Sequence, residues 1–190
     1  MAILELSQQS RSYRRFHQER PVERELLEQL VGLVPHCPSA RNMQPLKFVL
    51  SHTVNRNALI FPTLVWAGYL RAWPGPAEGE RPSAYIVMLE DLQLSRSSEV
   101  DQGIAAQTIM LGAAERGLGG CMVAAFKREH LVQVLQLPSH LRPVLVLALG
   151  YPSEQVRIVP MPADGCVEYY RDEHGVHYVP KRSLAELLVD

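Results

Sequence analysis

The spacing of apolar residues along this chain predicts where its helices and strands lie. After Pro21, four apolar residues (Val22, Leu26, Leu30 and Val34) repeat every four positions, as on the buried face of a helix with proline in its first turn. The longest continuous apolar run is too short to cross a bilayer and is typical of a buried strand. We expect strands at Lys47–Leu50, Ala84–Leu89, Cys121–Phe126 and Val144–Leu149.

Helices are expected between these strands. A long helix rich in small residues, Val100–Arg116, ends at Gly117, which would take the left-handed conformation of a helix cap. Three prolines and two glycines exclude regular helix or central strand from Trp73–Pro82. Tyr169–Tyr178 is expected to form a hairpin, and Ser183 to cap the last helix. The other predicted helices are Ile3–Ser10, Val54–Phe61, Val65–Ala72, Arg128–Leu135 and Leu184–Leu188.

Helices and strands are interspersed without a regular alternation of strand and helix. We therefore predict an α+β fold in one domain, residues 1–190, with a central, mostly antiparallel sheet of four to five strands flanked by helices. An irregular three-layer α/β arrangement is the alternative.

Charge and cysteine content narrow the partners and the compartment. With 19 basic and 20 acidic residues the net charge is -1, so no global field attracts nucleic acid or a membrane surface. Any anion site must be built from a few positioned residues. The N-terminus lacks the features of a secretory signal, and Cys37, Cys121 and Cys166 are an odd number without a CxxC pair. We expect a cytoplasmic protein with free thiols.

Two polar segments are candidates for ligand binding. In Arg11–Phe16, two guanidinium groups flank a hydroxyl, a set that can hold a phosphate; the alternative is a solvated basic face. In Pro38–Pro45, two prolines bracket serine and amide side chains that can both donate to and accept from the edge of a heteroaromatic ring. The alternative there is a plain connection between helix and strand.

Other signals are weaker or negative. Trp66, Tyr69 and Trp73 would share one face of the predicted helix, either packed in the core or forming a stacking wall for a planar substrate. Gly117–Gly120 follows a helix and precedes a strand, the reverse of the dinucleotide-binding order. His174 and His177 have no third ligand at metal-site spacing. No nucleophile elbow or phosphate-binding loop motif is present.

Four segments in their order along the chain resemble the nitroreductase family of flavoproteins. Arg11–Phe16 is similar to the family's RSxRxF element, and Pro38–Phe48 to PSAxNxQPWxF, with Leu46 in place of tryptophan. Asp101–Gln107, leading to Gly117-Leu118-Gly119, resembles the DxGxAAQ…GLG block. Val179–Leu184 looks like the closing basic element.

The resemblance implies a homodimer with FMN at the subunit interface and no catalytic side chain, because the flavin carries the chemistry. NAD(P)H would reduce flavin N5, and a small planar acceptor such as a nitroaromatic or quinone would then take the electrons. Trp66, Tyr69 and Trp73 would wall the acceptor site. The implied FMN-binding residues are Arg11, Ser12, Arg14, Pro38, Ser39, Ala40, Asn42, Gln44, Met122, Val123, Ala124, Ala125, Lys181 and Arg182.

Three rival hypotheses remain open at this point. One is a non-redox or flavin-consuming FMN-binding protein of the same fold. Another is a partner-binding domain whose basic clusters are solvated, which would be colourless. The third, a nucleic-acid binder, is disfavoured by the near-neutral net charge.

Overall fold

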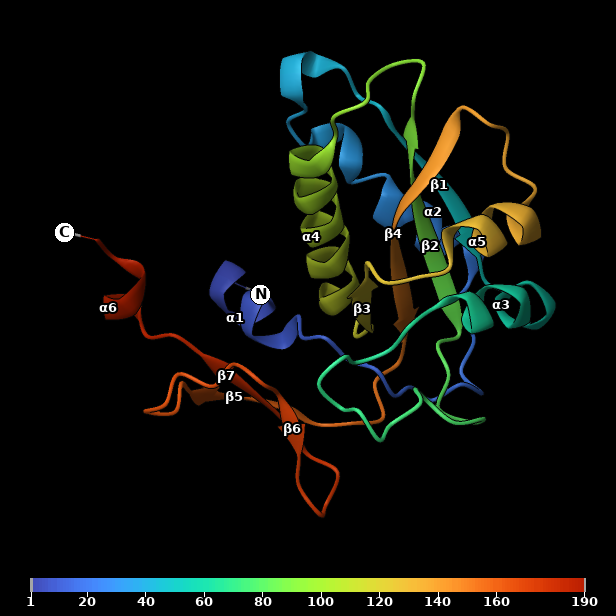
Figure 1. The fold of residues 1–190 in the computed structure, drawn as a ribbon. Coiled ribbons are helices and arrows are strands. Elements are labelled where there is room, and N and C mark those ends of the chain that lie inside the picture. The colour runs from blue at the N-terminus through green and yellow to red at the C-terminus, as the bar shows by residue number, and fades with distance from the viewer. Residues whose placement is uncertain (1, 190) are drawn as a thin grey trace.

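The computed structural model describes residues 2–189 and is built around a four-stranded antiparallel sheet (Figure 1). Its strand order is β1-β2-β4-β3. The predicted α+β fold with a central, mostly antiparallel sheet is confirmed. The strands are β1 (Leu46–Ser51), β2 (Ala84–Asp91), β3 (Gly119–Val123) and β4 (Leu141–Gly150).

Strand β2 lies at the centre of two apolar cores, one on each face of the sheet. Every residue of β2 is buried, and its side chains alternate between the two cores. On one face Ile86 and Met88 pack with α2 (Arg24–Val31) and α4 (Glu99–Glu115). On the other face Tyr85 and Val87 pack with α3 (Val54–Ile60) and α5 (Arg128–Leu135). Helices thus cover both faces of the sheet.

A smaller sheet forms from the last third of the chain. Strand β7 (His177–Lys181) pairs in parallel with β5 (Val156–Pro160) and antiparallel with β6 (Tyr170–Arg171). Figure 1 shows this sheet to one side of the main body, with α6 (Leu184–Leu187) at its outer end and α1 (Ile3–Gln9) nearby. The predicted hairpin is the β6–β7 pair, and β5 was not predicted.

Two predicted elements have clearly different bounds in the structure. Helix α2 begins at Arg24, not at Pro21, because the chain is still extended at Glu23 (φ -70, ψ 151). It ends before Val34, which starts a separate 3₁₀ turn, Val34–His36. The third strand spans Gly119–Val123 rather than Cys121–Phe126.

The predicted helix Val65–Ala72 is wrong. The backbone N–H of Val65 donates to the carbonyl of Ala125 at 2.9 Å, and Ala67 adopts a left-handed φ of 40. The chain here therefore runs alongside the segment after β3 and then turns. Consequently, the three aromatic residues do not share a helix face. Two further 3₁₀ turns, Ala40–Asn42 and Phe61–Thr63, complete the secondary structure.

No helix within residues 2–189 combines the length and apolar character needed to cross a membrane.

Candidate functional site

A cavity of about 370 Å³ brings together residues from both ends of the chain. We call it the basic pocket. It is lined by five of the predicted binding residues: Arg11, Ser12, Arg14, Met122 and Lys181. The segment around Ser12 reaches this position because it bridges to Gly120, with the N–H of Tyr13 donating to the Gly120 carbonyl at 2.9 Å.

The side chain of Glu154 fixes the backbone at Arg14 and Arg15. Its carboxylate accepts the N–H groups of Arg14 and Arg15, and at 2.7 Å it accepts the guanidinium of Arg171. The Glu154 side chain is only 1% exposed, so this anchor is shielded from water. The guanidinium carbon of Arg14 then lies 4.8 Å from the ring centre of Tyr169. The backbone hydrogen bond to Glu154 and the aromatic contact of the guanidinium therefore limit the freedom of Arg14.

The basic pocket carries positive charge that nothing in the described chain neutralises. Arg11, Arg14 and Lys181 have no ion-pair partner among residues 2–189. His177 lines the same pocket, is fully buried, and has no hydrogen-bond partner at either ring nitrogen within that range. Burial and the nearby charges of Arg14, Arg171 and Arg15 lower the pKa of His177 to about 4. The pocket suits an anion with several acceptor oxygens.

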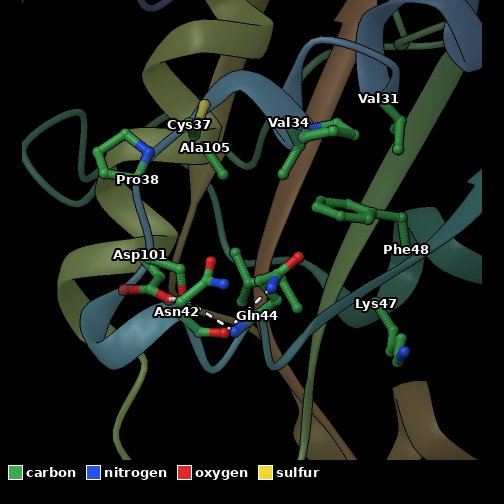
Figure 2. Close-up of a pocket in the computed structure, with 13 residues that line it drawn as sticks. Val31, Val34, Cys37, Pro38, Asn42, Gln44, Lys47, Phe48, Asp101 and Ala105 are labelled. Carbon is green, nitrogen blue, oxygen red and sulfur yellow. Dashed lines mark hydrogen bonds between the residues drawn. The ribbon is translucent and has the colours of Figure 1, made fainter.

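The second predicted segment, Pro38–Pro45, forms a separate structure that we call the amide loop. It lies beside a cavity of about 330 Å³ lined by Pro38, Ser39, Asn42 and Gln44. Figure 2 shows Asn42 and Gln44 next to Asp101, with Phe48, Val31 and Val34 across the cavity.

Asp101 holds the amide loop to the first turn of α4. Its carboxylate accepts the Ser39 hydroxyl at 2.5 Å and the Ala40 N–H at 3.0 Å, and the residue is 5% exposed. The Ser39 oxygen in turn accepts the N–H of Gln44 at 2.9 Å. Arg41, Asn42 and Gln44 all have positive φ (53, 55 and 49). A positive φ costs free energy for residues other than glycine, and it persists where surrounding contacts hold the backbone in that conformation.

The basic pocket and the amide loop lie on opposite sides of α4. The loop cavity is lined by Asp101 and Ala105, and the basic pocket by Gln107 and Met110. At about 100° per residue these two pairs face nearly opposite directions. Within one chain, therefore, the two predicted halves of the site do not meet.

The remaining predicted residues have varied surroundings. Val123 is buried in the core, whereas Ala124 and Ala125 are exposed beyond the end of β3. Arg182 is exposed and follows β7 without lining the basic pocket.

The three aromatic residues proposed to wall the acceptor site differ in exposure. Trp66 is 8% exposed and belongs to the core beside Phe61. Tyr69 is 44% exposed, and its ring lies edge-on to Tyr169. Trp73 lies under the Arg171 guanidinium, 4.2 Å from the ring centre.

Sequence reasoning missed three residues that organise the site. His177 was considered only as a metal ligand, and neither Glu154 nor Asp101 was singled out for its contacts. An isolated carboxylate gives no sequence signal when its partners are more than sixty positions away, as Ser39 is from Asp101. Among the described residues there is no group of three His, Cys, Asp or Glu side chains able to hold a metal.

One of the three cysteines, Cys121, is buried, whereas Cys37 lines the cavity of the amide loop. All three are free within the described residues. Burial raises the pKa of the Cys121 thiol, which disfavours the reactive thiolate.

An antiparallel sheet covered by helices on both faces, with a cationic pocket at its side, places the protein in the α+β class. The model of the nitroreductase family matches residues 8–67 and 77–151, and the chain belongs to that family.

Relatives agree with this assignment. A putative NADH dehydrogenase/NAD(P)H nitroreductase of Methanothermobacter thermautotrophicus is 28% identical over 81% of this chain and 79% of its own length. The FMN reductase (NADPH) of Bacillus subtilis is 34% identical over 35% of this chain, a match that spans only 27% of that enzyme. The crystal structure of a nitroreductase family protein from Streptococcus pneumoniae has a TM-score of 0.70 at 19% identity, covering 88% of this chain and 99% of that one.

Proposed function

We propose that this protein is an FMN-dependent oxidoreductase that transfers a hydride from NAD(P)H, through the flavin, to a small planar acceptor such as a nitroaromatic or a quinone. The observation that carries the proposal is the basic pocket. Three cations converge there without an ion-pair partner among residues 2–189, beside a buried histidine with no hydrogen-bond partner in that range. The names of the relatives support the choice of FMN and NAD(P)H.

The residues present fit an FMN phosphate. Arg11, Arg14 and Lys181 would bind its oxygens through charge-assisted hydrogen bonds. The backbone at Gly120 is tightly packed, since a Cβ there would lie 2.7 Å from the carbonyl oxygen of Ala148. Glycine is therefore required where Ser12 bridges to β3.

The chemistry itself belongs to the flavin, which accepts and passes on a hydride when bound. The chain's own residues bind and orient. Asn42 and Gln44 would hydrogen-bond the edge of the ring system, and Arg182 would extend the phosphate site. Ala124 and Ala125, exposed after β3, would offer main-chain N–H groups to the flavin.

We further propose that the functional unit is a homodimer with two flavins. One chain places the basic pocket and the amide loop on opposite sides of α4, so a second copy would have to supply the loop to each pocket. Exposed apolar side chains on three helices support such a contact: Ile3, Leu4, Val100, Leu184 and Leu187. Three free cysteines support a location in the reducing cytoplasm.

The test is the visible absorption spectrum of the purified protein, before and after anaerobic addition of NADH or NADPH. We expect flavin bands that bleach with at least one of the two donors. Re-oxidation by a quinone after removal of the nicotinamide would then demonstrate two separate half-reactions. A yellow protein that neither donor bleaches would favour the non-redox flavin role. A colourless protein that does not bind added FMN would contradict the proposal.

A further inference from the structure

A third cavity, of about 290 Å³, lies where the chain enters β2. It shares no lining residue with the basic pocket or with the cavity of the amide loop. Its lining combines polar side chains with an apolar part formed by Pro21, Val54, Ala58, Phe61 and Pro82. We call it the donor pocket, after the unpaired hydrogen-bond donors in its lining.

Three residues at alternate positions line the donor pocket: Arg81, Ser83 and Tyr85. Arg81 and Ser83 lie in bends just before β2, and Tyr85 is the second residue of that strand, so all three line the cavity from one short segment. Ser83 is 7% exposed and Tyr85 is fully buried. In each residue one buried polar atom lacks a hydrogen-bond partner among residues 2–189: Nε of Arg81, Oγ of Ser83 and the phenol oxygen of Tyr85.

Three of the other polar side chains around this cavity, Gln18, Asn57 and Glu78, are already paired. The side chain of Asn57 accepts the Ser51 hydroxyl and donates to the Ser83 carbonyl, both at 2.7 Å. Glu78 forms an ion pair with Nη1 of Arg81 at 2.7 Å, which leaves the Nε side of the guanidinium free. Glu19, the other acid in the lining, has an exposed side chain whose carboxylate lies 3.4 Å from Nδ1 of His17. The unpaired atoms thus form a distinct group.

All three unpaired atoms are hydrogen-bond donors. A guanidinium has no acceptor, and burial raises the pKa of Tyr85, so its phenol remains an O–H donor near neutral pH. Buried donors in folded proteins are normally matched by acceptors. Two nearby glutamates disfavour a dianion, and the apolar walls favour a ligand with a hydrocarbon body.

We propose that the donor pocket binds a small monocarboxylic acid with an apolar or aromatic body. Its carboxylate would accept from Arg81, Ser83 and Tyr85, and its body would lie against Phe61 and Ala58. This inference does not depend on the proposed flavin chemistry, because it uses none of the residues assigned to the cofactor.

The experiment is isothermal titration calorimetry of the purified full chain with sodium benzoate, with sodium chloride substituted to keep the ionic strength constant. We expect saturable binding at one site per chain. Tyr85→Phe and Ser83→Ala each remove one donor with little change of shape. Each should weaken the affinity about tenfold, equivalent to about 1.4 kcal/mol.

The matched control is Tyr178→Phe, which makes the same chemical change at a hydroxyl bonded to Asp172 in the small sheet. It should leave the benzoate affinity unchanged, and neutral benzamide should bind more weakly than benzoate to the unmodified chain. The proposal is overturned if benzoate gives no saturable heat. It is equally overturned if neither Tyr85→Phe nor Ser83→Ala changes the affinity, since benzoate would then bind elsewhere.

Discussion

The two halves of the candidate FMN site are built in contrasting ways. The basic pocket collects residues from distant segments and depends on charge, with Arg14 and Lys181 more than 160 positions apart. The amide loop comes from eight consecutive residues, presents neutral groups and depends on a strained backbone held by Asp101. We infer that the basic pocket provides affinity for an anion, whereas the amide loop provides a fixed arrangement of neutral hydrogen-bonding groups. Mutations in the two halves should therefore differ in size and in kind.

Arg14→Ala should have the largest effect of the changes considered. It removes a charge-assisted contact to the phosphate worth about 1.5–3 kcal/mol, and therefore about 10- to 100-fold in FMN affinity. Titration of the flavin-free protein with FMN, followed by fluorescence quenching, measures this. Arg24→Ala removes an arginine whose partner is Glu28 on the exposed side of α2, and should leave the affinity unchanged. Equal affinities for Arg14→Ala and the unmodified protein would show that this pocket does not bind the phosphate.

Asn42→Ala should weaken FMN about tenfold, because it removes one amide from the loop. A mixture of Asn42→Ala chains with Arg14→Ala chains also tests whether one flavin is bound by residues of two chains. In a mixed dimer of the two single mutants, one site would carry both defects and the other would carry neither. Half of the sites in the mixed dimers, and therefore about a quarter of all sites after equal amounts of the two chains are mixed and re-associated, should regain the unmodified affinity. If both sites stay weak, the basic pocket and the loop that serve one flavin come from the same chain.

Local sequence patterns were sufficient to predict most of the fold. The all-apolar run Ala84–Leu89 and the small-residue helix before Gly117 correspond to β2 and α4, because burial on both faces and close packing leave a compositional trace. The predicted helix at Val65–Ala72 failed because its spacing is helical but its backbone pairs with Ala125 through a contact sixty positions away. Strand β5 is short and mostly exposed, and its parallel partner β7 lies further along the chain, so no local turn signals the pairing.

The site was less predictable than the fold. The basic cluster and the amide segment are each a continuous stretch of sequence, so both could be recognised as candidate binding segments. Their location on opposite faces of α4 depends on tertiary structure and could not be predicted from the sequence. His177 becomes a member of the basic pocket only because β7 pairs with β5 and β6, which no local pattern encodes.

Asp101→Asn should have a moderate effect that separates shape from charge. The carboxylate accepts from Ser39 and Ala40, whereas an amide retains a single acceptor oxygen. We expect the free energy of unfolding to fall by about 1 kcal/mol and FMN affinity to fall a few-fold. Chemical denaturation and FMN titration measure the two quantities. Glu99→Gln, an exposed carboxylate in the same first turn of α4, controls for the helix dipole. An unchanged affinity would show that the flavin does not require the Asp101 anchor.

At neutral pH a change at His177 should produce the smallest effect, because the imidazole is uncharged in both the folded and the unfolded chain; its contribution is a pH dependence of stability in acid. Its pKa is lowered to about 4 in the folded state, against 6.5 for an ordinary histidine. As the pH falls from about 6.5 to about 4, His177 becomes protonated in the unfolded chain but stays neutral in the folded chain. The free energy of unfolding therefore decreases across that range. The slope is at most about 1.4 kcal/mol per pH unit for one proton.

Denaturation of the flavin-free protein at several pH values should show a shallower loss of stability with falling pH in His177→Gln than in the unmodified chain. His174→Gln, in the exposed turn of the same hairpin, is the matched control. Identical curves for His177→Gln and the unmodified protein would mean that His177 takes up its proton as readily in the fold as outside it.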